Sequence, residues 1–124
     1  MVAVADVKLA LRQSEQQRKL KLVELSYGYR LVCKAVEIER NASFEVSIDV
    51  LGDDVVRDDL MAERVDTHIV EAATAPIAIE RKLLVGASLL DEDIGDDEIK
   101  VRVRVRSESG DVAEGMSEIV LGRF

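Results

Sequence analysis

The sequence has few of the residues on which recognisable site chemistry depends. It contains one cysteine, one histidine, one proline and no tryptophan in 124 residues. A single cysteine excludes an intrachain disulfide framework and any metal site built from several cysteines. Two tyrosines and two phenylalanines leave little aromatic surface on which sugars or bases could stack.

An excess of positive charge and a long apolar run are also missing. The chain carries 25 acidic and 17 basic side chains, a net charge of −8. Because binding to phosphates needs a basic surface, we expect no nucleic acid partner. No apolar run approaches the roughly 18 residues of a membrane helix, and Asp6 and Lys8 interrupt the stretch that a secretory signal would need. We therefore expect a cytoplasmic protein without a membrane span.

Alternation of apolar and polar residues is what the sequence does have. From Ile99 to Arg106, four β-branched residues alternate with four cations, and residues 43–50 repeat the pattern with acidic and hydroxyl side chains. A strand places such residues on opposite faces, whereas a helix would scatter them. Further strands are predicted at residues 7–11, 19–33, 65–70, 77–85 and 117–121. The alternation slips by one residue after Leu22 and again near Ala35, which predicts two β-bulges.

These strands predict a single all-β domain over residues 1–124. The expected architecture is an antiparallel two-sheet β-sandwich of immunoglobulin or jelly-roll type with seven or eight strands, and a small β-barrel is the alternative. At most one short helix is expected, near residues 53–64, where Val56 and Leu60 lie one helical turn apart. Residues 12–18 are expected to form a loop or a single helical turn. Residues 1–18 either pack within the domain or form an N-terminal arm or a strand exchanged between subunits.

A row of cations on one strand is the first candidate site. This basic ladder consists of Lys100, Arg102, Arg104 and Arg106. It could bind an anion, a phosphate or an acidic partner, it could protect an edge strand, or it could pair with acidic neighbours such as Glu45, Asp49 or Glu118. The net negative charge favours pairing, and the use of such pairs is then to fix strand register or exclude wrong partners.

Acidic loops form the second candidate site. Residues 41–98 hold sixteen acidic and four basic side chains. Clustered loop carboxylates can bind calcium, and the residues offered for it are Asp91, Asp93, Asp96 and Asp97. The spacing does not match the helix–loop–helix calcium motif, so a solvated acidic turn without a cofactor is the favoured interpretation, and calcium binding is the alternative.

The lone histidine and the lone cysteine carry no recognisable catalytic pattern. His68 shares a strand face with Asp66, opposite Val65 and Ile69, and is expected to be an exposed strand histidine. Cys33 is in phase with Leu31 and is expected to be a small buried residue. With no nucleophile placed beside a base, we expect a protein that is not an enzyme.

The function expected from these features is a non-catalytic protein–protein interaction or assembly subunit that self-associates through charged and apolar β surfaces. The contacts would come from the basic ladder and from acidic residues of the other loop: Asp53, Asp54, Asp58 and Asp59. Two alternatives stay open. One is a calcium-dependent binding module built on residues 91–98, and the other is a small acidic inhibitor or immunity-type protein that masks a basic partner.

Overall fold

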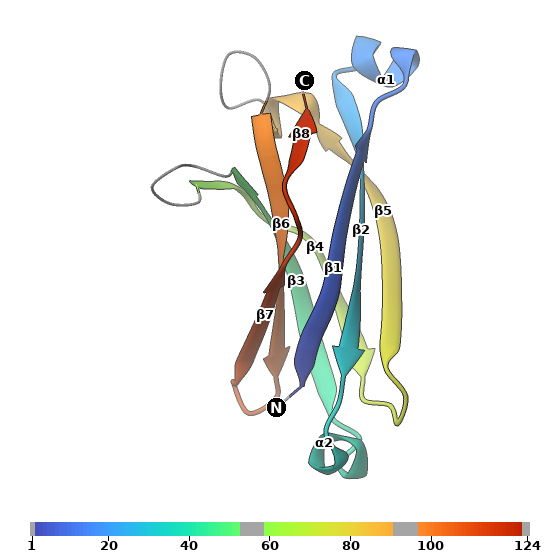
Figure 1. Cartoon of the computed structure of the whole chain (residues 1–124), viewed down its shortest axis with the longest axis vertical. Coiled ribbons are helices and arrows are strands. Elements are labelled where there is room, and N and C mark those ends of the chain that lie inside the picture. Colours follow the sequence, from blue (N-terminus) through green and yellow to red (C-terminus); the bar gives the residue numbers. More distant parts are fainter. Residues whose placement is uncertain (1, 53–58, 91–96, 123–124) are drawn as a thin grey trace.

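Two antiparallel sheets face each other in the computed structural model, which describes residues 2–52, 59–90 and 97–122 (Figure 1). Sheet A has the order β1-β2-β5, with β1 at Ala3–Arg12, β2 at Leu22–Val32 and β5 at Ile77–Gly86. Sheet B has the order β4-β3-β6-β7, and β8 also pairs with β6. Its strands are β3 (Ser43–Gly52), β4 (Asp59–Glu71), β6 (Asp97–Ser107), β7 (Val112–Met116) and β8 (Val120–Gly122). The predicted sandwich is confirmed, and the sheets do not close into the alternative barrel.

The core lies between the sheets and comes from the alternating residues of three central strands. Leu25 and Leu31 of β2 and Ile48 of β3 are fully buried. The inward face of β6 supplies four more fully buried residues: Ile99, Val101, Val103 and Val105. Burial of a side chain of this kind stabilises the fold by roughly 1.5–3 kcal/mol. The alternation in residues 99–106 therefore marks the inner face of a central strand.

Neither phase slip is the bulge that the sequence predicts. The slip near Ala35 is a short helix, and the slip after Leu22 arises because residues 15–21 form a short helix and a turn, so that β2 begins only at Leu22. Helix α1 (Glu15–Lys19) begins after Ser14, whose hydroxyl accepts a hydrogen bond from the Gln17 amide, and ends before β2. Helix α2 (Ala35–Glu39) links β2 to β3. A single helical turn changes which face the next strand presents, so it leaves the same one-residue mark on the alternation as a bulge.

The helix expected near residues 53–64 is wrong where the structure describes that segment. Residues 59–64 are the first part of β4, and Leu60 pairs with Leu51 of β3. The pairing of Leu60 overrides the weak local preference for a helix, and Val56 lies outside the described residues. A 3-10 turn (Ala87–Leu89) follows β5 instead.

The strand expected over residues 117–121 forms only in its last part, as β8 (Val120–Gly122), and β7 ends before it at Met116. Ser117 separates β7 from β8, and its amide and hydroxyl group both bond to the Val101 backbone, at 3.0 Å each. The described part of the chain contains no helix that is long and apolar enough to cross a membrane.

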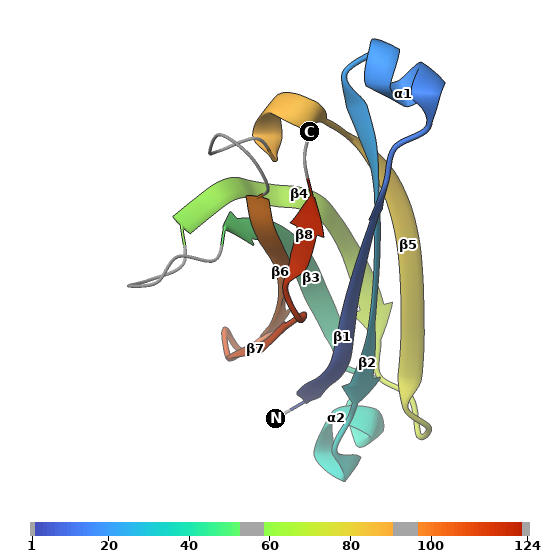
Figure 2. The ribbon, with the colours of Figure 1, turned by 45° about the horizontal axis from the view of Figure 1, so that its top comes forward.

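The edges of the two sheets approach each other on two sides of the sandwich, and the contacts differ between these sides. On one side β1 lies against β7 and β8 (Figure 2). A Cβ atom at Gly115 of β7 would lie 2.8 Å from Val4 Cγ1 and 2.9 Å from Val7 Cγ2, so this side is closed by direct packing. On the other side the edge strands β4 and β5 meet, and their polar side chains bridge the sheets.

Candidate functional site

Two arginines of the basic ladder form ion pairs with carboxylates of neighbouring strands. Its strand β6 lies between β3 and β7, so it does not protect an edge. Arg102 Nη2 lies 2.7 Å from Asp49 Oδ2, and Arg104 Nε lies 3.1 Å from Glu114 Oε1. The pairing with Asp49 that the sequence predicts is therefore present, whereas Glu45 pairs with Arg64 of β4 instead.

Asp49 is the buried anchor of this arrangement, with 1% of its surface exposed. One carboxylate oxygen accepts two hydrogen bonds from Arg102, and the other accepts the Arg64 amide at 2.9 Å. Arg64 has a positive φ of 52°, at the point where the register between β3 and β4 shifts. A buried carboxylate with three donors thus holds an irregular turn of the backbone in β4.

The proposed acidic sites fall largely outside the described residues. Asp53, Asp54, Asp58, Asp91, Asp93 and Asp96 lie there, while Asp59 and Asp97 are the first residues of β4 and β6. Within residues 2–52, 59–90 and 97–122, no group of three acidic, histidine or cysteine side chains is placed to hold a metal ion.

A polar cluster between the sheets is a feature that the sequence reasoning did not find. This inter-sheet polar cluster comprises Tyr27, Tyr29, Asp66, His68 and Arg81, from β2, β4 and β5. The Tyr27 hydroxyl donates to Asp66 Oδ2 at 2.6 Å, and Arg81 Nε donates to the same oxygen at 2.8 Å. The Tyr29 hydroxyl is hydrogen-bonded to His68 Nε2, and the two tyrosine rings stack with centroids 6.2 Å apart.

The electrostatics of the cluster keep its hydroxyl and imidazole groups neutral. Burial, together with the Asp66 charge, raises the pKa values of both tyrosines above their usual range. Burial also lowers the pKa of His68, and the Arg81 guanidinium lowers it further. Burial alone would raise the pKa of Asp66, but the hydrogen bonds from Tyr27 and Arg81 outweigh it and lower that pKa.

This arrangement is better suited to holding the sheets together than to catalysis. A tyrosine with a raised pKa is a hydrogen-bond donor and a poor base or nucleophile at neutral pH. The lowered pKa of Asp66 makes this carboxylate a weak base, and two donors already bond to its Oδ2 atom. The Asp66–Arg81 pair therefore ties the edge of sheet B to the edge of sheet A.

The expectation of an exposed histidine is wrong for a definable reason. Val70 is buried, and Asp66 and His68 share its face of β4, whereas Ile69 on the other face is 66% exposed. The irregularity at Arg64 resets the phase of β4, and the sequence pattern does not show it. One residue in the sequence does indicate a polar cluster on the inner face. Arg81 occupies a position on β5 that the alternation assigns to an apolar residue, between Ile79 and Leu83. Cys33 is partly buried against the core, close to expectation.

The outer edge of β5 is the longest regular edge among the described strands. In the part of the chain that the structure describes, β5 hydrogen-bonds only to β2, in ten consecutive pairs without a register shift. Figures 1 and 2 both place β5 at the outer side of sheet A. The other described edges are irregular or short, because β1 and β4 carry register shifts and β7 and β8 have five and three residues.

No protein-family model matches the chain, and no curated protein matches its sequence. The chain is similar in structure to a Bordetella pertussis protein provisionally assigned as ApaA, with a TM-score of 0.45 and 10% identity over 97% of this chain and 92% of that one. A second structural genomics target gives a TM-score of 0.44 and 11% identity over 99% of this chain and 86% of that one. Neither likeness bears on function.

Proposed function

We propose that the protein is a non-catalytic assembly subunit that self-associates through its β surfaces. The observation that carries the proposal is the β5 edge. A long, regular edge strand presents unpaired backbone groups, which pair readily with another strand. Natural sheets usually blunt such edges with bulges, short strands or covering segments, and the other described edges of this molecule show the first two of these devices.

An exposed apolar side chain beside the edge supports the same proposal. Leu84 of β5 is 56% exposed on the outer face of sheet A. Addition of a strand next to β5 would cover part of this side chain, and burial of apolar surface drives association. By contrast, two arginines of the basic ladder already have carboxylate partners within the chain.

Replacement of Leu84 tests the proposal. The wild-type protein is expected to show, by light scattering, a discrete mass that is a multiple of 13.7 kDa. Leu84→Lys should raise the dissociation constant about tenfold, since it removes apolar contact and puts an extra cation at the edge. Leu121→Lys is the matched control, because Leu121 of β8 is similarly exposed (65%) and lies on sheet B. A wild-type protein that stays monomeric at every concentration would contradict the proposal.

A further inference from the structure

The order of residues along β5 is self-complementary about Arg81. On the outer face of sheet A, Glu80 and Lys82 flank this residue at equal distances, and Ala78 and Leu84 lie two residues farther out. On the inner face the equivalent positions are all apolar: Ile77 and Ile79 on one side, Leu83 and Val85 on the other. The inner face is therefore apolar on both sides of Arg81, and the outer face carries charges of opposite sign that an antiparallel copy would bring together.

We propose that β5 pairs with β5 of a second copy of the chain, antiparallel and with Arg81 opposite Arg81. This inference rests on the proposed function and names its partner and contact. A two-fold axis perpendicular to the sheet keeps both inner faces on the same side. The two copies then share one continuous sheet of six strands, β1-β2-β5 followed by the same strands in reverse.

Charge favours this register over the two nearest ones, in which Glu80 or Lys82 lies at the axis. With Arg81 at the axis, Glu80 of each copy lies opposite Lys82 of the other, and opposite charges at directly paired positions stabilise a sheet. If Glu80 or Lys82 were at the axis instead, that residue would face its own copy. Side chains would also mismatch on the inner face, where Arg81 would face Ile79 or Leu83.

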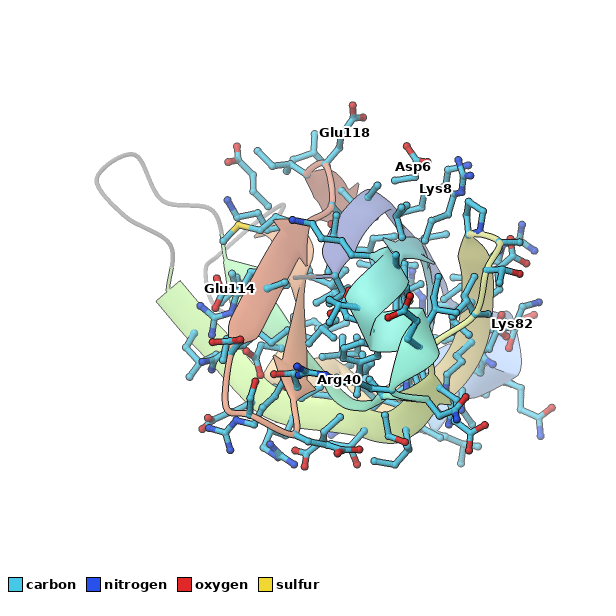
Figure 3. All side chains as sticks on the ribbon, turned by 90° about the horizontal axis from the view of Figure 1, so that it is seen from below. Asp6, Lys8, Arg40, Lys82, Glu114 and Glu118 are labelled. Carbon is cyan, nitrogen blue, oxygen red and sulfur yellow. The ribbon has the colours of Figure 1, made fainter. Side chains whose placement is uncertain are left out.

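Exposure of the charged pair is compatible with this contact. The Lys82 side chain is 71% exposed, and its nearest carboxylate, Glu24, lies 4.0 Å away. Figure 3 shows Lys82 directed outward on the β5 side, while Glu118 lies on a different side of the molecule. A strand protected by charges of one sign would repel its copy, whereas Glu80 and Lys82 attract it.

The two arginines at the axis each bring their own counter-ion. Arg81 contacts both oxygens of Asp66, at 2.8 and 3.4 Å, and its side chain is 46% exposed. The Asp66 charge offsets the repulsion between like charges that directly opposed arginines would otherwise suffer. The inter-sheet polar cluster thus makes the axis position tolerable for a cation.

A charge-swap experiment on the full chain tests the register. Glu80→Lys alone and Lys82→Glu alone should each raise the dissociation constant of the dimer about tenfold or more, because two attractive pairs become repulsive. The double variant Glu80→Lys with Lys82→Glu restores opposite charges across the axis, and should return the dissociation constant to within about threefold of wild type. Sedimentation at several concentrations measures the constant, and circular dichroism with thermal melting confirms that each variant folds.

Charge reversals elsewhere on the surface serve as controls. Arg40→Glu at the end of α2 and Glu118→Lys between β7 and β8 make the same two changes of charge away from β5 and should leave the dissociation constant unchanged (Figure 3). If the wild type associates but the β5 variants behave like these controls, or if the double variant does not recover, the β5 pairing is wrong and assembly uses another surface. A wild type that never associates overturns the assembly proposal itself.

Discussion

At the scale of single residues, a buried charge supports the irregular backbone of β4. Asp49 is almost fully buried, yet it satisfies Arg102 and the Arg64 amide at once. The free energy of such a group comes from its partners, since an unpaired buried charge or donor is costly. Removal of the carboxylate would leave a half-buried guanidinium and a strained backbone turn without support.

Asp49→Ala should therefore lower the free energy of unfolding by about 3 kcal/mol. Urea denaturation monitored by circular dichroism measures the change. Glu45→Ala is the control, because the Glu45–Arg64 pair lies on the surface with both side chains about half exposed. Its loss should cost less than about 1 kcal/mol. Equal effects of the two substitutions would show that Asp49 does not hold β4.

His68 provides a pH-dependent test of the inter-sheet polar cluster. Its pKa in the folded protein is lowered from the ordinary value of 6.5, by burial and by Arg81. Between those two values the unfolded chain binds a proton that the folded chain does not, so stability falls as pH falls below about 6.5. Asp66 has a lowered pKa as well, but its contribution to stability is lost only at more acidic pH, below its ordinary value of 3.8.

His68→Gln should flatten this dependence, because glutamine offers Tyr29 a hydrogen-bond partner but has no proton to gain. The measurement is the urea midpoint of both proteins at several values between about pH 7 and 5. The wild-type midpoint should fall across this range relative to the variant. Parallel curves would show that His68 is as well solvated in the folded protein as in the unfolded chain.

At the scale of strands and helices, alternation predicts most of what forms. A half-buried strand alternates apolar and polar residues, because successive side chains point to the core and to solvent. This alternation predicts the inner face of β6, the length of β3 and the position of β5. Three features escape it. Helix α2 imitates a bulge, β4 begins where the spacing of Val56 and Leu60 predicts a helix, and residues 117–119 lie between β7 and β8 although they read as the start of a strand. The last two depend on contacts between residues distant in sequence, since Leu60 pairs with Leu51 and Ser117 bonds to the Val101 backbone.

The candidate site was less predictable than the fold for the same reason. Asp66 and His68 are assigned to the wrong face unless the irregularity at Arg64 is known, and Asp49 holds that irregularity from another strand. The pairing of the basic ladder with Asp49 was predictable, because both residues lie on regular strands with opposite charges.

The close approach of β1 and β7 is a property of these elements that a single methyl group should disturb. Gly115→Ala would put a Cβ atom against two valines and should cost about 1–3 kcal/mol of stability, as overpacking usually does. Gly86→Ala is the control, because its nearest neighbour would lie 3.8 Å away. Thermal melting compares them. If Gly115→Ala melts with Gly86→Ala, the two sheets are not in contact at β7.

At the scale of the whole molecule, the sandwich is asymmetric. One open side is closed by apolar packing at Gly115, and the other is tied by the Asp66–Arg81 pair next to an unpaired edge. The proposed dimer adds a strand at this second side and leaves the first side unchanged. Association and the stability of the β1–β7 contact should therefore vary independently among variants, because distant sites are additive.

The separation of β2 and β5 along the chain also has a consequence for folding. Leu22 pairs with Gly86 and Leu31 with Ile77, so α2, β3 and β4 all separate the two strands along the chain. Closing a loop of this size is slow compared with forming the β1–β2 hairpin. Until it closes, the edge of β2 can accept β5 from a second chain as readily as its own. Refolding at high protein concentration should consequently produce strand-exchanged species that dissociate only by unfolding.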